Sequence, residues 1–533
     1  MNKSALCLML MLEWAVGPTA VAQTSRVVPL DEATIADINA AFDAGSLTSE
    51  QLVQMCLSRI RAYDRQGPSL RALITVNPKA VETARQLDAE RKTKGRRSSM
   101  HGIPVILKDN INTADLPTTA GSVMLEGSVP PNDAFLVKRL RDAGAVILGK
   151  ANMSEFASGP ARSSLGGQMR NPHDLARSPG GSSGGPGISV SAAYAVVAIG
   201  TDTGGSIRGP SSASGIAGLK PTHGLISRNG IVPLALSFDT PGPMARNVHD
   251  VAVALSVMAA MDPADAATKK SEGHIEADYT KFLKADALSG AHIGVARDFS
   301  GQDPDVDWAV EAEVAAMRRA GATVVDVHLP KWLLDAKGEF YDAVRYPEFT
   351  AQIADYLKTL GPGYPKDIQQ LMAKATEFNA LRPDGAGPNP NRWTMMKREA
   401  GSGGLYDYRY TTVRDHALPM VRAIIEGILR SQNLDTIVYP TQPKRPNLLT
   451  APPEPPGGGA GSPVNLANLT GFPDLIVPAG FTGDGLPVTL SFLGPAFSEP
   501  KLIGIAYSFE QSTHARRLPV NTPRLQGESI RVR

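Results

Sequence analysis

The stretch AVVAIGTDTGGSIR, residues 195–208, joins a run of apolar residues to a loop of small ones. Residues 195–199 are all apolar, which is the pattern of a strand buried on both faces of a sheet. Such a strand would give residues 203–206, Thr-Gly-Gly-Ser, a rigid base. Consecutive backbone N–H groups in a loop without bulky central side chains suit a developing oxyanion. A glycine-rich turn that only packs tightly is the structural alternative.

A second glycine cluster, GGSSGG, lies upstream at residues 180–185. It matches Gly-x-Ser-x-Gly twice, centred on Ser182 and on Ser183, a motif that marks a nucleophile only between a strand and a helix. The lead-in RNPHDLARSP, residues 170–179, contains two prolines and no apolar alternation. The pattern therefore does not favour a nucleophile elbow. Neither cluster has the Gly-x-x-x-x-Gly-Lys-Ser/Thr order of a phosphate loop.

A lysine, Lys108, closes the apolar stretch GIPVIL at residues 102–107. Burial disfavours the charged form of a lysine, so its pKa would fall and it could accept a proton. A serine hydroxyl needs such a base when it attacks. Histidine is the commoner base, and the nine histidines leave a Ser-His-Asp arrangement open. Lys108 and the two serine clusters together favour a serine nucleophile with a lysine base.

Short apolar runs bounded by Gly, Pro or Asp recur along the chain and are typical of strands. Helical periodicity marks residues 31–64, 78–94, 134–143 and 248–261. We expect a single α/β catalytic domain, in which a large mixed, mostly parallel β-sheet is covered by helices on both faces. The expected strands are 103–107, 145–148, 196–199, 293–296, 323–327, 436–439, 475–477 and 488–492.

The segment from about residue 262 to residue 430 is charge-rich and mostly helical, with Tyr, Trp and Met scattered through 340–410. We interpret it as an insertion that shapes the mouth of a substrate pocket within the catalytic domain, residues 23–533. Residues 451–462 hold four prolines and four glycines and are expected to form a surface loop.

The first 22 residues have the pattern of a secretory signal peptide: Lys3 is followed by an apolar stretch at 5–12 and by Ala-Val-Ala at 20–22. We therefore expect an exported protein, periplasmic or secreted. Cys56 would be the one cysteine of the mature chain and lies on a helical apolar spacing, so we expect it to be buried. No later segment has the roughly 18 uninterrupted apolar residues of a membrane span.

Composition limits the class of partner. Hydrophobic residues make up 42% of the 533 residues and charged residues 20%, as in ordinary globular proteins. The formal net charge is +2, so the chain has no general basic excess that would attract nucleic acid or anionic lipid. We expect a small-molecule or peptide substrate and no nucleic-acid partner.

The chain resembles the amidase signature family over most of the catalytic core. The matching pieces are HGIPVILKDN (101–110), GAVILGKAN (144–152), the two serine clusters, GLKPTHG (218–224) and DTPGPMAR (239–246). The spacing between Ser182 and Ser206 also resembles that of the family. Within the family, the leader and the C-terminal run FSEPKLI (497–503) make the chain most similar to bacterial peptide amidases.

The resemblance implies a role for several residues. Ser206 corresponds to the acyl-forming nucleophile, Ser182 to a bridging serine that follows a cis peptide bond, and Lys108 to the base. A proton would pass from Ser206 through Ser182 to Lys108, and neither a metal nor an organic cofactor is needed. The oxyanion hole would consist of Thr203, Gly204, Gly205 and the Ser206 amide, supported by Ser183, Asp202 and Arg208.

Other residues of the matching pieces are expected to be structural. Lys150 and Lys220 would serve the scaffold, and His101 and His223, which lie beside glycines, would be hydrogen-bond donors and not bases. The pair at residues 186–187, Pro-Gly, departs from the small helix-forming residues common in the family. Proline is tolerated in the first turn of a helix, so this departure shifts the helix start without removing the serines.

The implied activity is cleavage of a carboxamide C–N bond through an acyl-enzyme on Ser206, with peptide C-terminal amides as the suggested substrates. An aryl-acylamide or carbamate hydrolase would use the same core. The A-type subunit of a tRNA-dependent amidotransferase shares it too, but needs a cytoplasmic partner subunit. The leader argues against that alternative, so we expect no obligate partner subunit. A non-catalytic solute-binding protein is the last alternative, and the spaced serines and the lysine argue against it.

Overall fold

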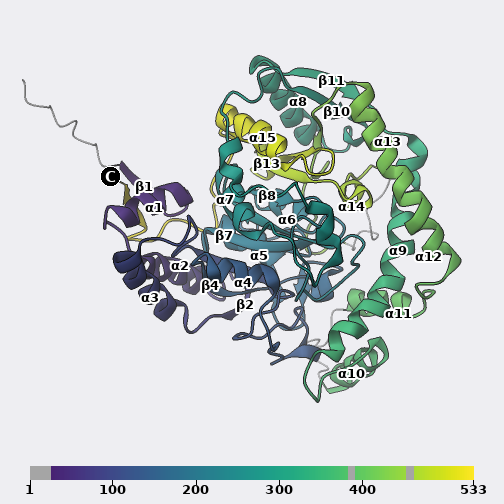
Figure 1. Cartoon of the computed structure of the whole chain (residues 1–533), viewed down its shortest axis with the longest axis horizontal. Helices are drawn as coiled ribbons and strands as arrows, with labels where there is room; N and C mark the ends of the chain where they lie inside the picture. Colours follow the sequence, from purple (N-terminus) through teal and green to yellow (C-terminus); the bar gives the residue numbers. More distant parts are fainter. Residues whose placement is uncertain (1–25, 382–389, 452–460, 533) are drawn as a thin grey trace, which may run out of the picture.

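Figure 1 shows the computed structural model, which describes residues 26–381, 390–451 and 461–532. The predicted signal peptide at 1–22 and most of the expected loop at 451–462 lie outside these ranges. The helices are α1 (Ile35–Asp43), α2 (Ser49–Tyr63), α3 (Ala80–Lys94), α4 (Phe135–Asp142), α5 (Gly184–Ser191), α6 (Arg208–Ala213), α7 (Val248–Met258), α8 (Pro304–Arg319), α9 (Lys331–Lys358), α10 (Ile368–Leu381), α11 (Pro390–Ala400), α12 (Tyr408–Thr412), α13 (Leu418–Ser431), α14 (Leu466–Thr470) and α15 (Glu499–Thr513).

Within the described residues, one sheet of eleven strands runs through the molecule in the order β11-β10-β12-β14-β13-β8-β9-β7-β3-β4-β2. Two short two-stranded sheets, β1–β15 and β5–β6, lie apart from it. The strands are β1 (Arg26–Pro29), β2 (Leu73–Val76), β3 (Pro104–Lys108), β4 (Val146–Ala151), β5 (Arg162–Ser163), β6 (Gly167–Gln168), β7 (Val197–Asp202), β8 (Ala217–Lys220), β9 (Thr240–Ala245), β10 (His292–Ala296), β11 (Thr323–Val327), β12 (Thr436–Pro440), β13 (Asp474–Phe481), β14 (Pro487–Leu493) and β15 (Ser529–Val532).

The expected α/β fold is confirmed, and each of the eight expected strands is present. The sheet is more evenly mixed than expected. Four neighbouring pairs are parallel, at β7-β3-β4 and at β11-β10-β12. The other six pairs are antiparallel.

Three of the six antiparallel pairs involve β8 or β9, two strands that sequence reasoning missed. Strand β9 reads Thr-Pro-Gly-Pro-Met-Ala, and proline and glycine normally mark turns. Both prolines of β9 lie opposite residues of β7. They have no partner in β8, because the pairing of β9 with β8 is limited to Ala245 and Met244. A proline is tolerated where its missing N–H has no ladder partner. Both strands therefore fit into the centre of the sheet.

Helices cover the sheet on both faces. The pair α5 and α6 packs together on one face, and α7, α8 and α15 pack against the other (Figure 1). The N-terminal helices α1, α2 and α3, which lie in the ranges with helical periodicity, form a layer at one end of the molecule (Figure 1), and Cys56 is fully buried in α2, as predicted. No helix in the described parts of the chain is long and apolar enough to cross a bilayer.

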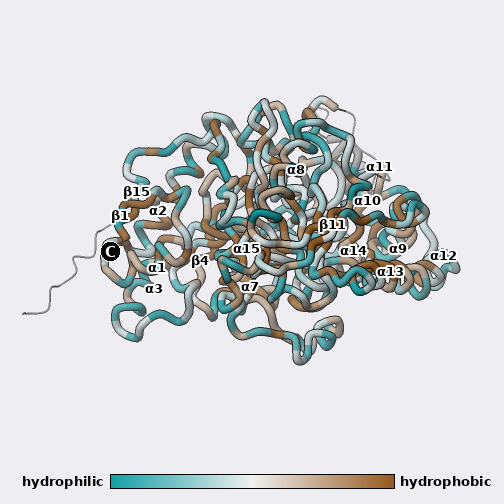
Figure 2. The backbone as a smooth tube through the Cα atoms, turned by 90° about the horizontal axis from the view of Figure 1, so that it is seen from above, coloured by the Kyte–Doolittle hydropathy of each residue, from teal (hydrophilic) through white to brown (hydrophobic). Residues whose placement is uncertain are grey.

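The range 262–430, expected as one mostly helical insertion, divides into two parts. Its first part contributes β10 and β11 to the central sheet and α8 to the helices that cover it. The second part, residues 331–381 and 390–431, forms a helical arm at the side of the molecule, which runs from α9 to α13 (Figure 1). Apolar segments line its junction with the body along α13 and α14 (Figure 2). Helix α13 buries Val421, Ile425 and Leu429, which lie on one face at four-residue spacing.

Candidate active site

Lys108 is the last residue of β3, a strand whose five residues are all buried. Its Nζ lies 2.7 Å from Ser182 Oγ, 2.8 Å from Thr201 Oγ1 and 3.2 Å from the Thr201 carbonyl oxygen. Because β3 and β7 are parallel neighbours, their carboxyl ends lie at the same edge of the sheet, and this brings Lys108 and Thr201 together. The predicted lysine and the first serine cluster are therefore in direct contact.

Burial lowers the pKa of Lys108 to about 7, against the opposing influence of the negative charges of Asp202 and Asp239. A lysine in water stays protonated to a much higher pH. Near neutral pH a large share of Lys108 is therefore uncharged, and an uncharged amine can accept a proton from the hydroxyl that it contacts. This is the electrostatic condition that a lysine base requires.

The two serine clusters lie side by side. The peptide bond between Gly181 and Ser182 is cis, as the resemblance implied. The Ser183 N–H donates to the Ser206 carbonyl oxygen at 3.2 Å, which links the clusters through their backbones. The Ser182 side chain is buried, whereas Ser206 is half-buried. Among the described residues, no hydrogen bond joins the hydroxyls of Ser182 and Ser206.

The glycine loop, residues 203–206, connects the end of β7 to α6. Gly205 has φ +105°, a conformation that side chains other than glycine rarely adopt. Its N–H donates to Asp202 Oδ1 at 2.7 Å, and this differs from the expected role of Gly205 as an oxyanion donor. No residue of the described ranges accepts a hydrogen bond from the N–H of Thr203, Gly204 or Ser206. These three amides are the donors that the loop can offer.

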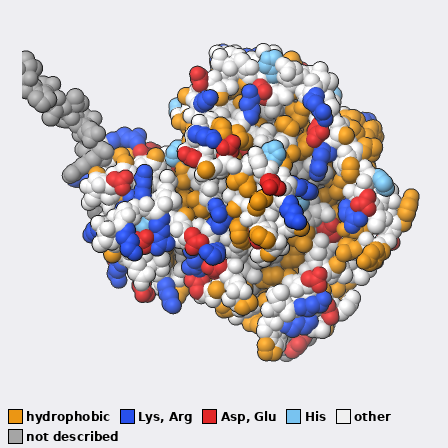
Figure 3. Space-filling view, viewed as in Figure 1, with side chains coloured by type: hydrophobic (Ala, Val, Ile, Leu, Met, Phe, Trp, Pro, Cys, Tyr) orange, Lys and Arg blue, Asp and Glu red, His pale blue; other side chains and the backbone are white. Residues whose placement is uncertain are grey.

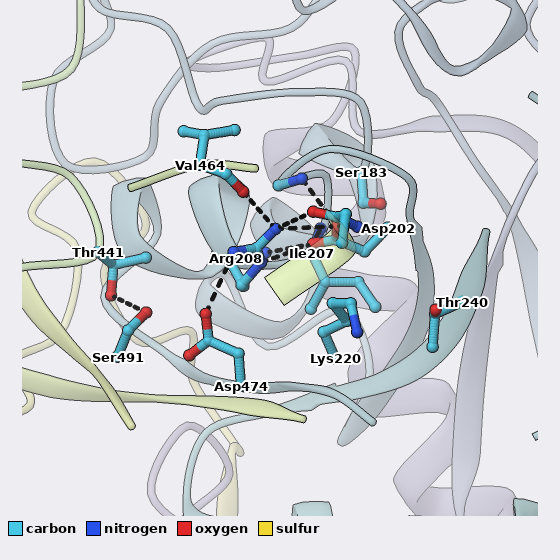
Figure 4. Close-up of polar contacts among 12 residues, drawn as sticks. Ser183, Asp202, Ile207, Arg208, Lys220, Thr240, Thr441, Val464, Asp474 and Ser491 are labelled. Atoms are coloured by element: carbon cyan, nitrogen blue, oxygen red, sulfur yellow. Dashed lines mark hydrogen bonds and ion pairs between the residues drawn. The ribbon is translucent and has the colours of Figure 1, made fainter. Parts of the chain in front are cut away.

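A network of buried charged side chains, formed by Asp202, Arg208 and Asp474, lies beside the glycine loop (Figure 4). Asp202 accepts hydrogen bonds from the Ile207 N–H at 2.9 Å and from Arg208 Nε at 3.2 Å. Arg208 also donates to Asp474 at 3.2 Å and to the Val464 carbonyl oxygen at 2.6 Å. Burial alone would raise the pKa of Asp202, but the Arg208 charge and the hydrogen bonds hold it below its ordinary value. Asp202 and Arg208 are thus bonded to each other and to the backbone of the glycine loop, and their supporting role stays a prediction.

Ser183 contacts the same strand end as Lys108. Its hydroxyl donates to the Thr201 carbonyl oxygen at 3.1 Å and accepts from the Thr201 N–H at 3.3 Å. These two bonds tie the first serine cluster to β7. The supporting role of Ser183 stays a prediction.

Sequence reasoning missed three residues that complete this region. Thr201 accepts from Lys108, and Asn110 Nδ2 donates to the same Thr201 hydroxyl at 3.1 Å. Asp239 accepts a hydrogen bond from the Thr203 hydroxyl. All three lie in or beside the quoted motifs, but no local pattern distinguishes them there. Only the fold brings them to the same place.

The residues expected to be structural bond to the scaffold and not to the serines. Their bonds are Lys150 to Thr118 at 2.6 Å, Lys220 to the Phe472 carbonyl at 2.8 Å, His101 to the Leu87 carbonyl at 2.9 Å and His223 to the Leu236 carbonyl at 2.9 Å.

No group of three or more His, Cys, Asp or Glu side chains that could hold a metal ion occurs within the described ranges.

The arm approaches the glycine loop directly. Figure 3 shows a hollow with many hydrophobic side chains between the arm and the body. Tyr341 of α9 stacks on Phe238 with ring centroids 5.3 Å apart. A Cβ atom placed on Gly204 would lie only 2.7 Å from the Tyr341 hydroxyl oxygen. The arm therefore forms a wall over the loop that carries Ser206.

Comparisons with known proteins agree over most of the chain. The Amidase family model matches residues 51–503. The A-type subunit of glutamyl-tRNA(Gln) amidotransferase from Halorhodospira halophila is 36% identical over 502 residues, which are 91% of this chain and 98% of that protein. A probable amidase of Arabidopsis thaliana is 35% identical over 95% of this chain and 94% of that protein. The structure of a peptide amidase from Stenotrophomonas maltophilia has a TM-score of 0.82 at 40% identity and covers 92% of this chain and 99% of its own.

Proposed function

Because the chain belongs to the amidase signature family and hydrolyses amide C–N bonds, we propose that it acts through an acyl-enzyme formed on Ser206. The observation that carries the proposal is the 2.7 Å contact between Lys108 Nζ and Ser182 Oγ in a fully buried setting. It pairs a lysine that can be neutral with a serine hydroxyl. Ser206, in the adjacent loop, is the more exposed of the two serines and can reach a substrate.

In the proposed first half-reaction, Ser206 Oγ attacks the amide carbon. Its proton moves to Ser182 Oγ, while the Ser182 proton moves to Lys108. The negative charge that develops on the carbonyl oxygen is stabilised by the free amides of the glycine loop, which the Asp202 network holds in place. Collapse of the adduct breaks the C–N bond, and the leaving nitrogen takes a proton back through Ser182.

In the second half-reaction, a water molecule attacks the ester on Ser206. The same relay accepts one proton of the water and returns it to Ser206 Oγ as the carboxylic acid product leaves, and this acid then gives its own proton to solvent. Each proton removed during attack is thus returned during collapse. The relay needs Lys108 to be neutral at the start of each half-reaction, and burial supplies that condition.

We propose peptide C-terminal amides as the substrates. The support is the 40% identity to a peptide amidase over 92% of this chain, a span that includes both the core and the arm. Aryl-acylamide and carbamate hydrolysis are alternatives, because they would use the same serines and differ only in the pocket.

A panel of peptide amides, anilides, carbamates and esters, assayed by release of ammonia or aniline, tests this proposal. Ser206→Ala should abolish turnover of every substrate. Ser189→Ala is the matched control, since it removes a buried hydroxyl that bonds only the Gly185 carbonyl of its own helix. Release of aniline but not of ammonia would contradict the substrate class. Turnover by Ser206→Ala at the wild-type rate would contradict the nucleophile.

A second candidate function is supported by the amidotransferase relatives, one of which covers 91% of this chain. In that case the chain would release ammonia efficiently only with partner subunits. Purified chain, free of other proteins, should hydrolyse a peptide amide if the first proposal is right. Glutamine hydrolysis that appears only on addition of partner subunits would favour the second.

We also propose that the protein is exported, on the strength of the leader at residues 1–22. Its mature N-terminus should then be Gln23. N-terminal sequencing of the protein recovered from periplasmic and cytoplasmic fractions tests this. An intact Met1 in a cytoplasmic product would contradict it.

A further inference from the structure

Asp239 lies directly before β9 and against the glycine loop. Its side chain is buried and accepts a hydrogen bond from the Thr203 hydroxyl. Its second carboxylate oxygen accepts from the N–H groups of Leu234 at 2.9 Å and Ala235 at 3.1 Å. The carboxylate is thus held by the backbone of its own loop and in turn fixes the side chain of Thr203, the first residue of the glycine loop.

Asp239 and the contacts of Lys108 line the same small cavity. Its polar walls include Asn110, Thr201, Thr203 and Asp239. Thr201 Oγ1 lies 2.8 Å from Lys108 Nζ, so the lysine contacts one wall of this space while the carboxylate forms another. Asn110 Oδ1, also buried, has no hydrogen-bond partner in the described part of the chain. The rest of the wall is mostly apolar, with Val232 and Leu234 among its residues, so Asp239 and Thr201 are polar groups at the edge of a largely apolar cavity.

Few other charges act in this region. Arg228 also lines the cavity; its guanidinium is paired with Asp265, and its positive charge also opposes the rise in the pKa of Asp239 that burial causes. Asp202 acts on Lys108 from the opposite loop, and its own charge is paired with Arg208. Asp239 differs from Asp202 in this respect, since its three hydrogen-bond donors are all neutral. A further titratable neighbour is the Tyr341 hydroxyl on α9, whose pKa burial raises above its ordinary value.

We propose that Asp239 is a positioning residue of the active site, which fixes the Thr203 side chain at the start of the glycine loop and presents an unpaired negative charge to Lys108 across the cavity. The contact with Thr203 orders the amides that face the oxyanion. The negative charge stabilises the protonated form of Lys108 after it has accepted a proton. The inference rests on the proposed role of Lys108 as the base.

Burial raises the pKa of Asp239 to about 6, so its carboxylate is charged when the enzyme works at pH 7 and above. A negative charge near a lysine favours the ammonium form. Removing that charge therefore lowers the pKa of Lys108. Since activity rises with pH as Lys108 loses its proton, the acid limb of the profile of kcat/KM against pH must then move to lower pH.

Asp239→Asn tests this, because it removes the charge and keeps the size of the side chain. We expect kcat to fall and the acid limb to move down by about one pH unit, the order of shift produced by one nearby charge. Thr203→Val is the matched variant. It removes the hydroxyl that Asp239 holds but keeps the carboxylate, so kcat should fall while the limb stays in place.

Two further variants keep the test decisive. Asp239→Glu retains the charge and should retain the wild-type limb with a lower kcat. Asp239→Ser gives a second uncharged side chain, smaller than asparagine, if Asp239→Asn does not fold by circular dichroism.

The role of Asp239 would be overturned if Lys108→Ala is inactive and the acid limb of kcat/KM keeps its wild-type position in Asp239→Asn or Asp239→Ser. Full turnover by Lys108→Ala would instead overturn the proposed base. The two failures are therefore distinguishable.

Discussion

Replacing Lys108 with methionine separates the effect of this lysine on the free energy of unfolding from its contribution to catalysis. Methionine has a similar length and no charge, but it cannot form the three hydrogen bonds of Lys108 Nζ, one to Ser182 and two to Thr201. We expect Lys108→Met to fold and to lack amide turnover. We also expect it to be more stable than the wild-type protein at pH 7.

The magnitude follows from the pKa of Lys108. Burial lowers this pKa from 10.5 to about 7. One pKa unit corresponds to about 1.4 kcal/mol, so burial of this lysine costs about 5 kcal/mol at pH 7. Three lost hydrogen bonds, at about 1 kcal/mol each, offset part of the gain from removing it. The net expected stabilisation of Lys108→Met at pH 7 is therefore about 2 kcal/mol.

The sign of the pH dependence is fixed by proton binding. Between pH 7 and pH 10.5 the unfolded chain keeps the Lys108 proton and the folded chain does not. The free energy of unfolding of the wild-type protein therefore rises with pH across this window. Lys108→Met lacks this contribution. Its advantage at pH 7 should shrink and then reverse as the pH approaches 10.

Urea unfolding of both proteins at pH 7, 8, 9 and 10 measures the difference, alongside kcat for a peptide amide. Lys220→Met is the matched control. Lys220 is equally buried and burial also lowers its pKa to about 7, but it donates to the backbone carbonyls of Pro221 and Phe472. Its replacement should give a similar pH-dependent stability difference and retain activity.

Two results would refute the reasoning. Wild-type turnover by Lys108→Met would show that this lysine is not the base. An inactive variant whose stability difference is the same at pH 7 and pH 10 would show that burial does not neutralise Lys108 in this window.

Two further predictions concern the glycine loop. Arg208→Leu leaves Asp202 and Asp474 buried without their cation and should lower the free energy of unfolding by about 3–5 kcal/mol in urea titrations; a loss below about 1 kcal/mol would contradict the network. Gly204→Ala places a Cβ 2.7 Å from the hydroxyl oxygen and 2.8 Å from Cζ of Tyr341, so kcat should fall, and adding Tyr341→Ala to the same chain should restore part of it. An unchanged kcat in Gly204→Ala would show that α9 does not press on the loop.

The strands of this fold were predictable where their side chains are uniformly apolar. Residues 103–107 and 196–199 mark two of them, because a strand buried on both faces tolerates little else. Strand β9 was not predictable, since its residues Thr-Pro-Gly-Pro-Met-Ala carry turn signals. Its place in the sheet depends on the neighbours that it meets, and these come from other parts of the chain.

The candidate site shows the same limit. Lys108, Ser182 and Ser206 could be singled out because each lies in a distinctive local pattern. The contact between Lys108 and Thr201, 93 positions apart, requires β3 and β7 to be neighbours. The bond from Thr203 to Asp239 spans 36 positions in the same way. Residues that act through other residues carry no local pattern, because their role is defined by the assembled sheet.

The pairing of β1 with β15 bears on how the protein is made. Arg26 pairs with Val532, and Pro29 with Ser529, so the first described strand has its partner at the far end of the chain (Figure 1). At about 5–20 residues per second, a ribosome needs roughly 25–100 s to travel between these two strands. During that time the edge of β1 has no strand to bind. This sheet therefore cannot be completed before β15 has been synthesised, and that event sets the earliest moment at which the N-terminal helices and the last strand can come together.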